Sequence, residues 1–271
     1  MVLWLAGQPT GFKSKIKLSD IEYLNLSDKD VRAAKAPADR AIPTLEQIGH
    51  VINGMPSGTA IEKRNRALLA FIALTGIRDG AAITLRLKHV DLTGPIPCVI
   101  QNPNQVSTKN SKRIDTFFFP IGEPFAALVL DWIHFLKTDL LFGNDDPLFP
   151  KTATALDADG CFAPAGLTRA FWATASPIRD IFRLAFLHVG LPSYRPHSFR
   201  HMLVQVAYQR KLSHAQLKAW SQNLGHVSLL TTLSSYGKIP LEQQGQLIGT
   251  STAAAGDNDS DFKEQVRRLL G

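Results

Sequence analysis

Four short segments of the chain carry the residue types that phosphate chemistry requires. They are TGIR (75–78), STKNSK (107–112), HSFRH (197–201) and LGHVSLLTTLSSY (224–236), and together they hold two arginines, two lysines, three histidines and a tyrosine. Guanidinium groups stay charged and donate two parallel hydrogen bonds, so they suit a phosphate whose oxygens gain negative charge during displacement. A histidine with a pKa near ~6.5 transfers protons at neutral pH. These side chains are suited to binding a phosphate group and to transferring protons beside it.

The order and spacing of these segments resemble the catalytic domain of the tyrosine recombinase, or phage integrase, family. That domain has an Arg after a Thr-Gly turn, a Lys in a β-hairpin, the patterns HxxR and LGH, and a nucleophilic Tyr shortly downstream. The resemblance spans residues 42–240. It implies a mainly α fold with a small antiparallel β-sheet, and a recombinase or integrase of a mobile element that cleaves and rejoins DNA. It further implies no metal, cofactor or ATP, with double-stranded DNA and a homotetramer on that DNA as partners.

The resemblance assigns phosphate binding to Arg78 and Arg200, and proton transfer at the attacking hydroxyl to His197. His197 and Arg200 lie three positions apart after Pro196, a first-turn residue, so both should project from one face of one helix. Each residue also has a structural interpretation. Arg78 would then be a surface arginine in an ion pair at a helix start, and His197 would cap its own helix.

Two further histidines lie close to these motifs. His226 follows Gly225 at a predicted tight turn, where a ring N–H can reach a nonbridging phosphate oxygen. Its structural alternative is a residue at a helix N-terminus that bonds only to backbone. His201, four positions after His197, is interpreted as a structural or backbone-contacting residue.

The resemblance makes Tyr236 the nucleophile that forms a 3′-phosphotyrosyl bond. A free phenol titrates near pH ~10, so it attacks well only beside a base and several cations. Lys109 is the favoured general acid for the departing 5′-oxygen, because its flexible stem can reach from a hairpin tip. Lys112 is the alternative for this role. Lys112 and Arg113 are otherwise predicted to contact the DNA backbone or solvent.

The chain departs from the family pattern near the first arginine. Many relatives have an acidic residue three positions after it, whereas this chain has Ala81 there and Asp79 directly after Arg78. The tyrosine is also one residue further from His226 than in the commonest arrangement. Neither departure removes a phosphate-binding or nucleophilic group.

Composition agrees with a polyanionic partner. The 271 residues carry 30 Lys and Arg against 23 Asp and Glu, a formal charge of +7, and phosphate contacts favour such cationic surfaces. The two cysteines, Cys98 and Cys161, stand far apart and match no zinc pattern, which favours a reduced, cytoplasmic compartment. The most apolar run, 67–74, is too short to span a membrane.

Hydrophobic periodicity predicts the elements that position these residues. A capping box at Thr44 and Gln47 should open a helix at 45–53, and Gly76 should end a deeply buried helix at 61–75. A third helix is expected from Asp79 to just before Leu92. One small sheet, a hairpin or three strands, is expected from 96–101 and 114–121. The remaining helices are predicted at 124–137, 167–189, 196–210, 214–222 and 229–235.

These elements suggest three regions. Residues 1–43 are interpreted as a remnant or linker of the core-binding domain that precedes the catalytic domain in relatives, so we expect weak DNA affinity. Residues 44–250 would form the catalytic domain. Residues 251–271 would form a flexible linker and a short amphipathic helix, which packs on its own domain or docks on a neighbouring copy.

Three other functions compete with recombination. A type IB topoisomerase shares the catalytic fold but acts as a monomer at one site. A catalytically silent relative would keep only DNA binding. A metal nuclease could use the eight histidines, but Arg200 between His197 and His201 would repel a cation bound there.

Overall fold

The computed structural model describes residues 41–108, 112–210 and 212–226. The chain divides into two units, Met1–Arg40 and Ala41–Gly271, and every described residue belongs to the second. Several predictions therefore fall outside the described residues. They concern the N-terminal segment up to residue 40, the helix at 229–235 and the C-terminal linker and helix.

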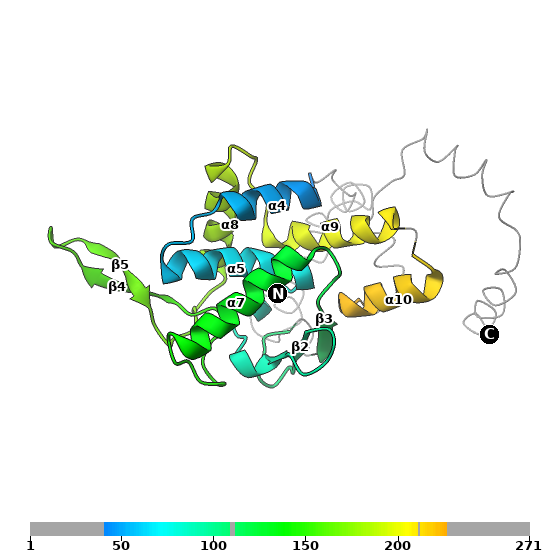
Figure 1. The fold of residues 1–271 in the computed structure, drawn as a ribbon, viewed down its shortest axis with the longest axis horizontal. Helices are drawn as coiled ribbons and strands as arrows, with labels where there is room; N and C mark the ends of the chain where they lie inside the picture. Colours follow the sequence, from blue (N-terminus) through cyan, green and yellow to red (C-terminus); the bar gives the residue numbers. More distant parts are fainter. Residues whose placement is uncertain (1–40, 109–111, 211, 227–271) are drawn as a thin grey trace, which may run out of the picture. The chain divides into compact units, whose positions relative to one another are not determined.

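The described part of the second unit is mainly helical, with two small antiparallel sheets (Figure 1). Its elements are α4 (Leu45–Gly54), α5 (Ala60–Thr75), α6 (Asp79–Ala82), the 3-10 turn η1 (Leu87–His89), β1 (Val90–Asp91), β2 (Cys98–Gln101), β3 (Ile114–Phe117), α7 (Glu123–Thr138), β4 (Thr152–Leu156), β5 (Phe162–Leu167), α8 (Ser176–His188), α9 (Pro196–Gln209) and α10 (His214–Asn223). The predicted helices corresponding to α4, α5, α7, α9 and α10 are confirmed. No helix in this part combines the length and apolar content needed to cross a bilayer.

The central helix is α5, which packs against α4, α7 and α9 (Figure 1). Its residues 67–75 are all buried, as the sequence predicted. The predicted capping box of α4 is also present: the Thr44 hydroxyl accepts the Gln47 N–H, and the Gln47 side chain accepts the Thr44 N–H. These two helices therefore begin and pack as local sequence dictates.

The third predicted helix is wrong in length. It was expected to continue to just before Leu92, but α6 ends at Ala82. The chain leaves the helix because it pairs with a distant segment: the Leu148 N–H donates to the Leu85 carbonyl, and Arg86 forms a β-bridge with Pro147. This tertiary pairing overrides the local helical pattern.

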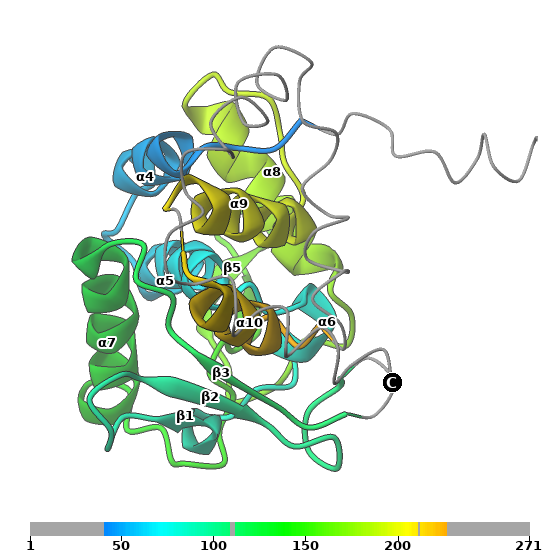
Figure 2. The ribbon, with the colours of Figure 1, turned by 90° about the vertical axis from the view of Figure 1, so that its right-hand side faces the viewer.

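The predicted small sheet has three strands in the order β1-β2-β3. β2 and β3 pair antiparallel from Cys98 opposite Phe117 to Gln101 opposite Ile114. Asn223, at the end of α10, fastens the sheet to that helix. Its side-chain oxygen accepts the Phe117 N–H at 2.7 Å, and its amide donates to the Phe117 carbonyl at 2.8 Å. Figure 2 shows α10 beside β3, and the Ile114 side chain at the start of β3 lies against Gly225 of the LGH turn.

The sequence did not predict the second sheet, a hairpin of β4 and β5. A helix was expected from residue 167 to residue 189, whereas residue 167 ends β5 and α8 begins only at Ser176, followed by Pro177. The strands contain alanine, glycine and proline, which have low β-propensity, so their sequence gives little indication of a strand. Antiparallel pairing from Thr152 to Leu167 stabilises them instead.

Aromatic side chains join α8 and α9. The Phe182 and Phe199 rings lie 4.9 Å apart between centroids, and Phe186 contacts Phe199 at 6.2 Å. All three side chains are fully buried. On the other side of α9, the Trp220 indole N–H donates to the Leu203 carbonyl at 3.0 Å. These contacts fix the helix that carries HSFRH between α8 and α10.

Candidate active site

The TGIR segment forms a tight turn between α5 and α6. Gly76 ends α5 in the left-handed conformation, with φ 58°, and Arg78 caps α6. The Thr75 hydroxyl donates to the Phe71 carbonyl at 2.6 Å and accepts the Ile77 N–H. A Cβ atom at Gly76 would lie 2.9 Å from a methyl of Leu203 and 2.9 Å from a methyl of Leu224. The turn therefore requires glycine both for its conformation and for its close packing.

Arg200 connects this turn to the LGH segment. Its side chain lies on α9 and is 5% exposed. One guanidinium nitrogen donates to the Gly76 carbonyl at 2.6 Å, and the other donates to the Leu224 carbonyl. Because each terminal nitrogen carries two hydrogens, donors remain for a further acceptor. Arg200 thus holds together two segments that are far apart in the sequence.

His197 lies one turn before Arg200 on α9, as the spacing predicted. Its ring packs edge-on against His201, with 5.2 Å between ring centroids. Loss of water contact, followed by the nearby charge of Arg200, lowers the pKa of His197 to about 4; His201 and Arg78 act in the same direction, and Asp79 opposes them. His197 is therefore neutral at pH 7 and able to accept a proton.

His226 lies on the turn that follows α10. Gly225 precedes it with φ 68°, and a Cβ there would come within 2.8 Å of the Ile114 side chain. The His226 N–H donates to the Ser221 carbonyl at 3.1 Å. Burial, then the charges of Arg200 and Arg78, lower the pKa of His226 to about 4. This second histidine is also neutral at pH 7.

Electrostatic coupling indicates that four of the predicted residues form one cluster. Arg78 and Arg200 lower the pKa of both His197 and His226, and Arg78 contributes after burial to lowering the pKa of Arg200 to about 9. Because such effects fall off with distance, these side chains must be close neighbours. They come from the α5–α6 turn, α9 and the turn after α10. This cluster of two arginines and two neutral histidines carries net positive charge, which favours binding of an anion.

Two residues near this cluster have partners that the motifs did not predict. The Arg179 guanidinium on α8 donates to the Asp79 carboxylate at 2.7 Å, and this ion pair joins α8 to the first residue of α6. His201 was interpreted as structural, and the structure places its ring against His197. The i, i+4 spacing on one helix was the available signal for that contact.

The remaining predicted residues are placed only in part. Tyr236 and Lys109 lie outside the described residues. Lys112 is exposed, and Arg113 forms an exposed ion pair with Asp115 at 3.1 Å. The Ser107 N–H donates to the Thr84 hydroxyl at 2.9 Å. This bond holds the segment that leads to Lys109 next to the end of α6, and therefore close to the turn that carries Arg78.

Acidification should destabilise the fold through His226. Its pKa is about 4 in the folded protein and about 6.5 when unfolded, so the unfolded chain binds a proton more readily. This contribution to stability is complete above pH ~6.5 and is lost as the pH falls toward ~4. Because the His226 ring is only half buried, solvent screening weakens this effect. We therefore expect His226→Gln to reduce the difference in unfolding free energy between pH ~7 and pH ~5 by about 1 kcal/mol. Urea unfolding of both proteins at both pH values measures this difference, and an identical difference in the two would contradict it.

Comparison with known proteins agrees with the fold. No family model matches the chain. It is 26% identical over 185 residues to tyrosine recombinase XerC of Bifidobacterium longum (strain DJO10A), and equally to that of Bifidobacterium longum subsp. infantis. Each match covers 68% of this chain and 46% of the relative. The chain thus spans about half the length of the curated relatives it matches.

Solved structures resemble the chain at low sequence identity. The XerA recombinase matches with a TM-score of 0.52 and 18% identity, covering 81% of this chain and 66% of that protein. XerH bound to difH DNA matches at 0.50 and 18%, covering 78% and 53%. A lambda integrase dimer on a core site matches at 0.50 and 15%, covering 79% and 67%. The predicted fold class, a tyrosine recombinase catalytic domain, is therefore confirmed. The chain is thus similar in sequence to the XerC tyrosine recombinases and shares the fold of recombinases and integrases.

Proposed function

We propose that this protein is a site-specific DNA recombinase that cleaves and rejoins strands through a 3′-phosphotyrosyl bond at Tyr236, without metal or ATP. The observation that carries the proposal is the cluster in which two guanidinium groups and two neutral histidines influence one another's pKa values. That cluster offers binding groups for a phosphate and a base at neutral pH. Its residues occupy the positions at which the family pattern has its catalytic groups.

The reaction begins with attack of the Tyr236 hydroxyl on the phosphorus. A tyrosyl O–P bond forms while the bond to the 5′-oxygen breaks, and the phenolic proton passes to His197. The departing oxygen takes a proton from Lys109, or from Lys112 if that lysine occupies the hairpin tip. The 3′-phosphotyrosyl bond keeps the energy of the phosphodiester, so attack by another 5′-hydroxyl rejoins strands without ATP.

The cluster stabilises the transition state through charge and hydrogen bonding. Arg78 and the unused donors of Arg200 bind the nonbridging oxygens, and a ring N–H of His226 adds another bond. Because the bound phosphate is negative, it raises the low pKa of His197 and makes that ring a better base when substrate is present.

Double-stranded DNA is the proposed partner, and strand exchange between two sites requires four copies. Among the solved relatives, XerH is bound to a difH substrate and the lambda integrase dimer is bound to a core site. The formal charge of +7 favours association with DNA at low salt. We propose further that residues 44–250 form the catalytic domain, and that Lys112 and Arg113 contact the DNA backbone.

The decisive experiment captures the covalent bond to DNA. A library of duplexes with a randomised central region and a nick that releases the cleaved end is incubated with the full chain in EDTA. Adducts that survive SDS are isolated and sequenced. We expect adducts enriched in one sequence class, present without divalent metal and absent in Tyr236→Phe.

The same experiment separates the competing functions. Tyr208→Phe serves as the matched control, because this tyrosine on α9 lies outside the LGH-to-Tyr segment. The yield of adduct from this variant should stay within about twofold of that from the unaltered protein. A topoisomerase would form the adduct but relax supercoiled plasmid without joining two sites. A silent DNA-binding relative would bind the library without an SDS-resistant adduct. Adducts that persist in Tyr236→Phe would refute the proposal.

A further inference from the structure

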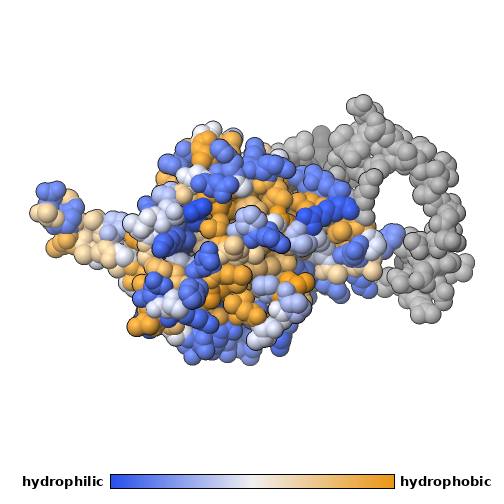
Figure 3. All heavy atoms as spheres, viewed as in Figure 1, coloured by the Kyte–Doolittle hydropathy of each residue, from blue (hydrophilic) through white to orange (hydrophobic). Residues whose placement is uncertain are grey.

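The β4–β5 hairpin, called here the arm, extends away from the helices (Figure 1). Leu156 and Phe162 face each other across its two strands, and they are 63% and 81% exposed. The Asp157 carboxylate accepts the N–H groups of Asp159 and Cys161 and so fixes the turn between them. Figure 3 shows hydrophobic and hydrophilic residues together at the end of this projection. A large apolar pair on a fixed, projecting turn is typical of a contact surface.

The arm is anchored by a buried charge. Arg64 on α5 is 3% exposed and donates to the Pro150 carbonyl and the Thr152 hydroxyl, both at 2.9 Å. Its guanidinium also lies 4.9 Å from the centre of the Trp172 ring. Because the base of the arm is held in this way, little conformational entropy is lost when the tip binds a partner.

Charge favours a protein partner for the arm. Residues 152–167 contain Asp157 and Asp159 and no Lys, Arg or His, in a chain whose formal charge is +7. DNA phosphates would repel this tip. A protein surface that combines aromatic side chains with cations would attract it.

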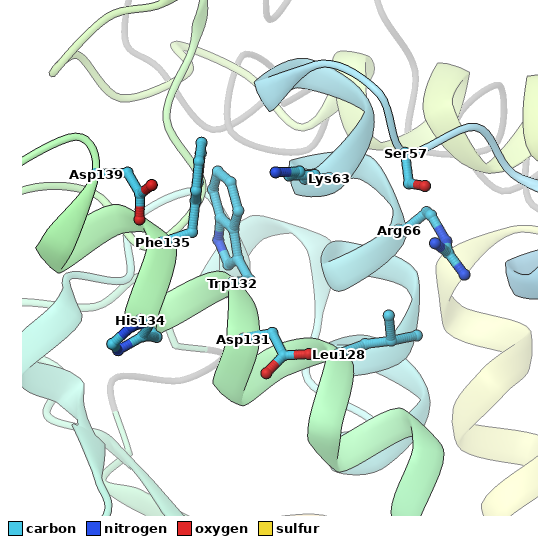
Figure 4. Close-up of a pocket in the computed structure, with 9 residues that line it drawn as sticks. All are labelled: Ser57, Lys63, Arg66, Leu128, Asp131, Trp132, His134, Phe135 and Asp139. Atoms are coloured by element: carbon cyan, nitrogen blue, oxygen red, sulfur yellow. The ribbon is translucent and has the colours of Figure 1, made fainter.

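The chain itself carries such a surface. A groove of about 410 Å³ lies between α5 and α7, with Leu128, Trp132 and Phe135 on the α7 side (Figure 4). Lys63 and Arg66 project from α5. The Lys63 ammonium lies 4.4 Å from the centre of the Phe135 ring.

The cations of the groove have no carboxylate partner among the described residues. The ion pairs of that part of the chain do not include Lys63 or Arg66, and Arg66 donates instead to the Ile52 carbonyl at 3.0 Å. Asp131, His134 and Asp139 also line the groove, on the α7 side. An incoming acidic turn would therefore approach on the α5 side, where the cations lie.

We propose that the arm of one copy docks in the α5–α7 groove of a second copy. Phe162 and Leu156 would pack against the partly exposed Leu128 and Phe135, with the acidic turn toward Lys63. The arm extends away from its own helices (Figure 1), so its tip is directed to another molecule. Each copy offers one arm and one groove, which makes the contact head-to-tail and able to close a ring or extend a chain. This contact is independent of the chemistry proposed for Tyr236.

Complementation between two variants of the full chain tests the contact. Phe162→Ser removes the aromatic side chain at the tip of the arm. Lys63→Glu replaces one positive charge in the groove with a negative one. We expect the unaltered chain to self-associate at concentrations up to about 100 µM. Each variant alone should have a dissociation constant about 30-fold higher than that of the unaltered chain. An equimolar mixture of the two should form a dimer and nothing larger, since one intact arm and one intact groove remain. Sedimentation velocity distinguishes these outcomes, and circular dichroism checks that both variants fold.

A cysteine crosslink locates the contact. Cys161 lies exposed in the turn of the arm, and Ser57 lines the groove on the side of the cations (Figure 4). In a Cys98→Ser background, a second cysteine at Ser57→Cys should therefore form an intermolecular disulfide with Cys161 on mild oxidation. The matched control, Asp180→Cys, places a thiol at an exposed site on α8 away from the groove. Equal crosslinking of both cysteines, or an unaltered chain that stays monomeric, would overturn the proposal. The adduct assay at Tyr236 is unaffected by either result.

Discussion

Replacement of Arg200 by methionine is expected to reduce the rate of DNA adduct formation about a thousandfold while changing the free energy of unfolding by less than about 1 kcal/mol. The large loss follows because the guanidinium would bind the phosphate in the transition state, and because it holds the turns at Gly76 and Leu224 in place. Removal of a single preorganised donor from such a site costs about a hundredfold or more.

The small change in stability has a separate cause. Burial, followed by the charge of Arg78, lowers the pKa of Arg200 to about 9, so the folded protein holds this cation at a cost. Methionine has a similar length, fills the space and removes that cost, which offsets the two hydrogen bonds to carbonyl groups that are lost. On this reasoning, the proposed contact with an anion, rather than stability, explains why a buried arginine occupies this position.

Arg200→Lys is the matched control. A lysine keeps the charge, but a single ammonium group cannot span two carbonyls and a phosphate as the planar guanidinium does, so we expect a rate about a hundredfold below that of the unaltered protein. Single-turnover kinetics and urea unfolding provide the two measurements. Adduct formation by Arg200→Met within about tenfold of normal would refute the phosphate role. A decrease of more than about 3 kcal/mol in the free energy of unfolding would show that Arg200 acts mainly by stabilising the fold.

The sequence predicted the helices that position the site because their periodicity and caps are local. His197 and Arg200 share a helical face through their spacing, and Gly76 ends α5 because only glycine readily adopts that left-handed turn. The partners of Arg200 could not be predicted in this way. They are backbone carbonyls 124 and 24 positions away, and only the tertiary packing of α9 brings them within reach.

The two wrong helices have the same physical origin. The segment after α6 has a helical pattern, but the pairing of Leu85 with Leu148 draws it into an extended path. The strands of the arm have little β-propensity, and their base is fixed by Arg64, which lies far away in the sequence. Local pattern therefore predicted the framework of the cluster, and it missed elements whose stability depends on distant side chains.

Gly76→Ala is expected to lower the free energy of unfolding by about 2–4 kcal/mol and to reduce adduct formation at least tenfold. Alanine at φ 58° is strained, and its Cβ would lie 2.9 Å from methyl groups of Leu203 and Leu224 and 3.3 Å from Cγ of Arg200. Relief of these overlaps must move either the turn that carries Arg78 or the side chain of Arg200, which donates to that turn. Both movements would change the spacing of the two arginines that are proposed to bind the phosphate.

Gly80→Ala is a control within the same segment. Gly80 lies in α6, and a Cβ there meets no atom within 4 Å. Alanine favours a helix over glycine, so this variant should be as stable as the unaltered protein or more stable by up to about 1 kcal/mol. Urea unfolding and single-turnover adduct formation measure both variants. Equal stability of the two would show that the turn adapts freely. A stable Gly76→Ala protein with normal activity would remove the argument that this glycine sets the geometry of the two arginines.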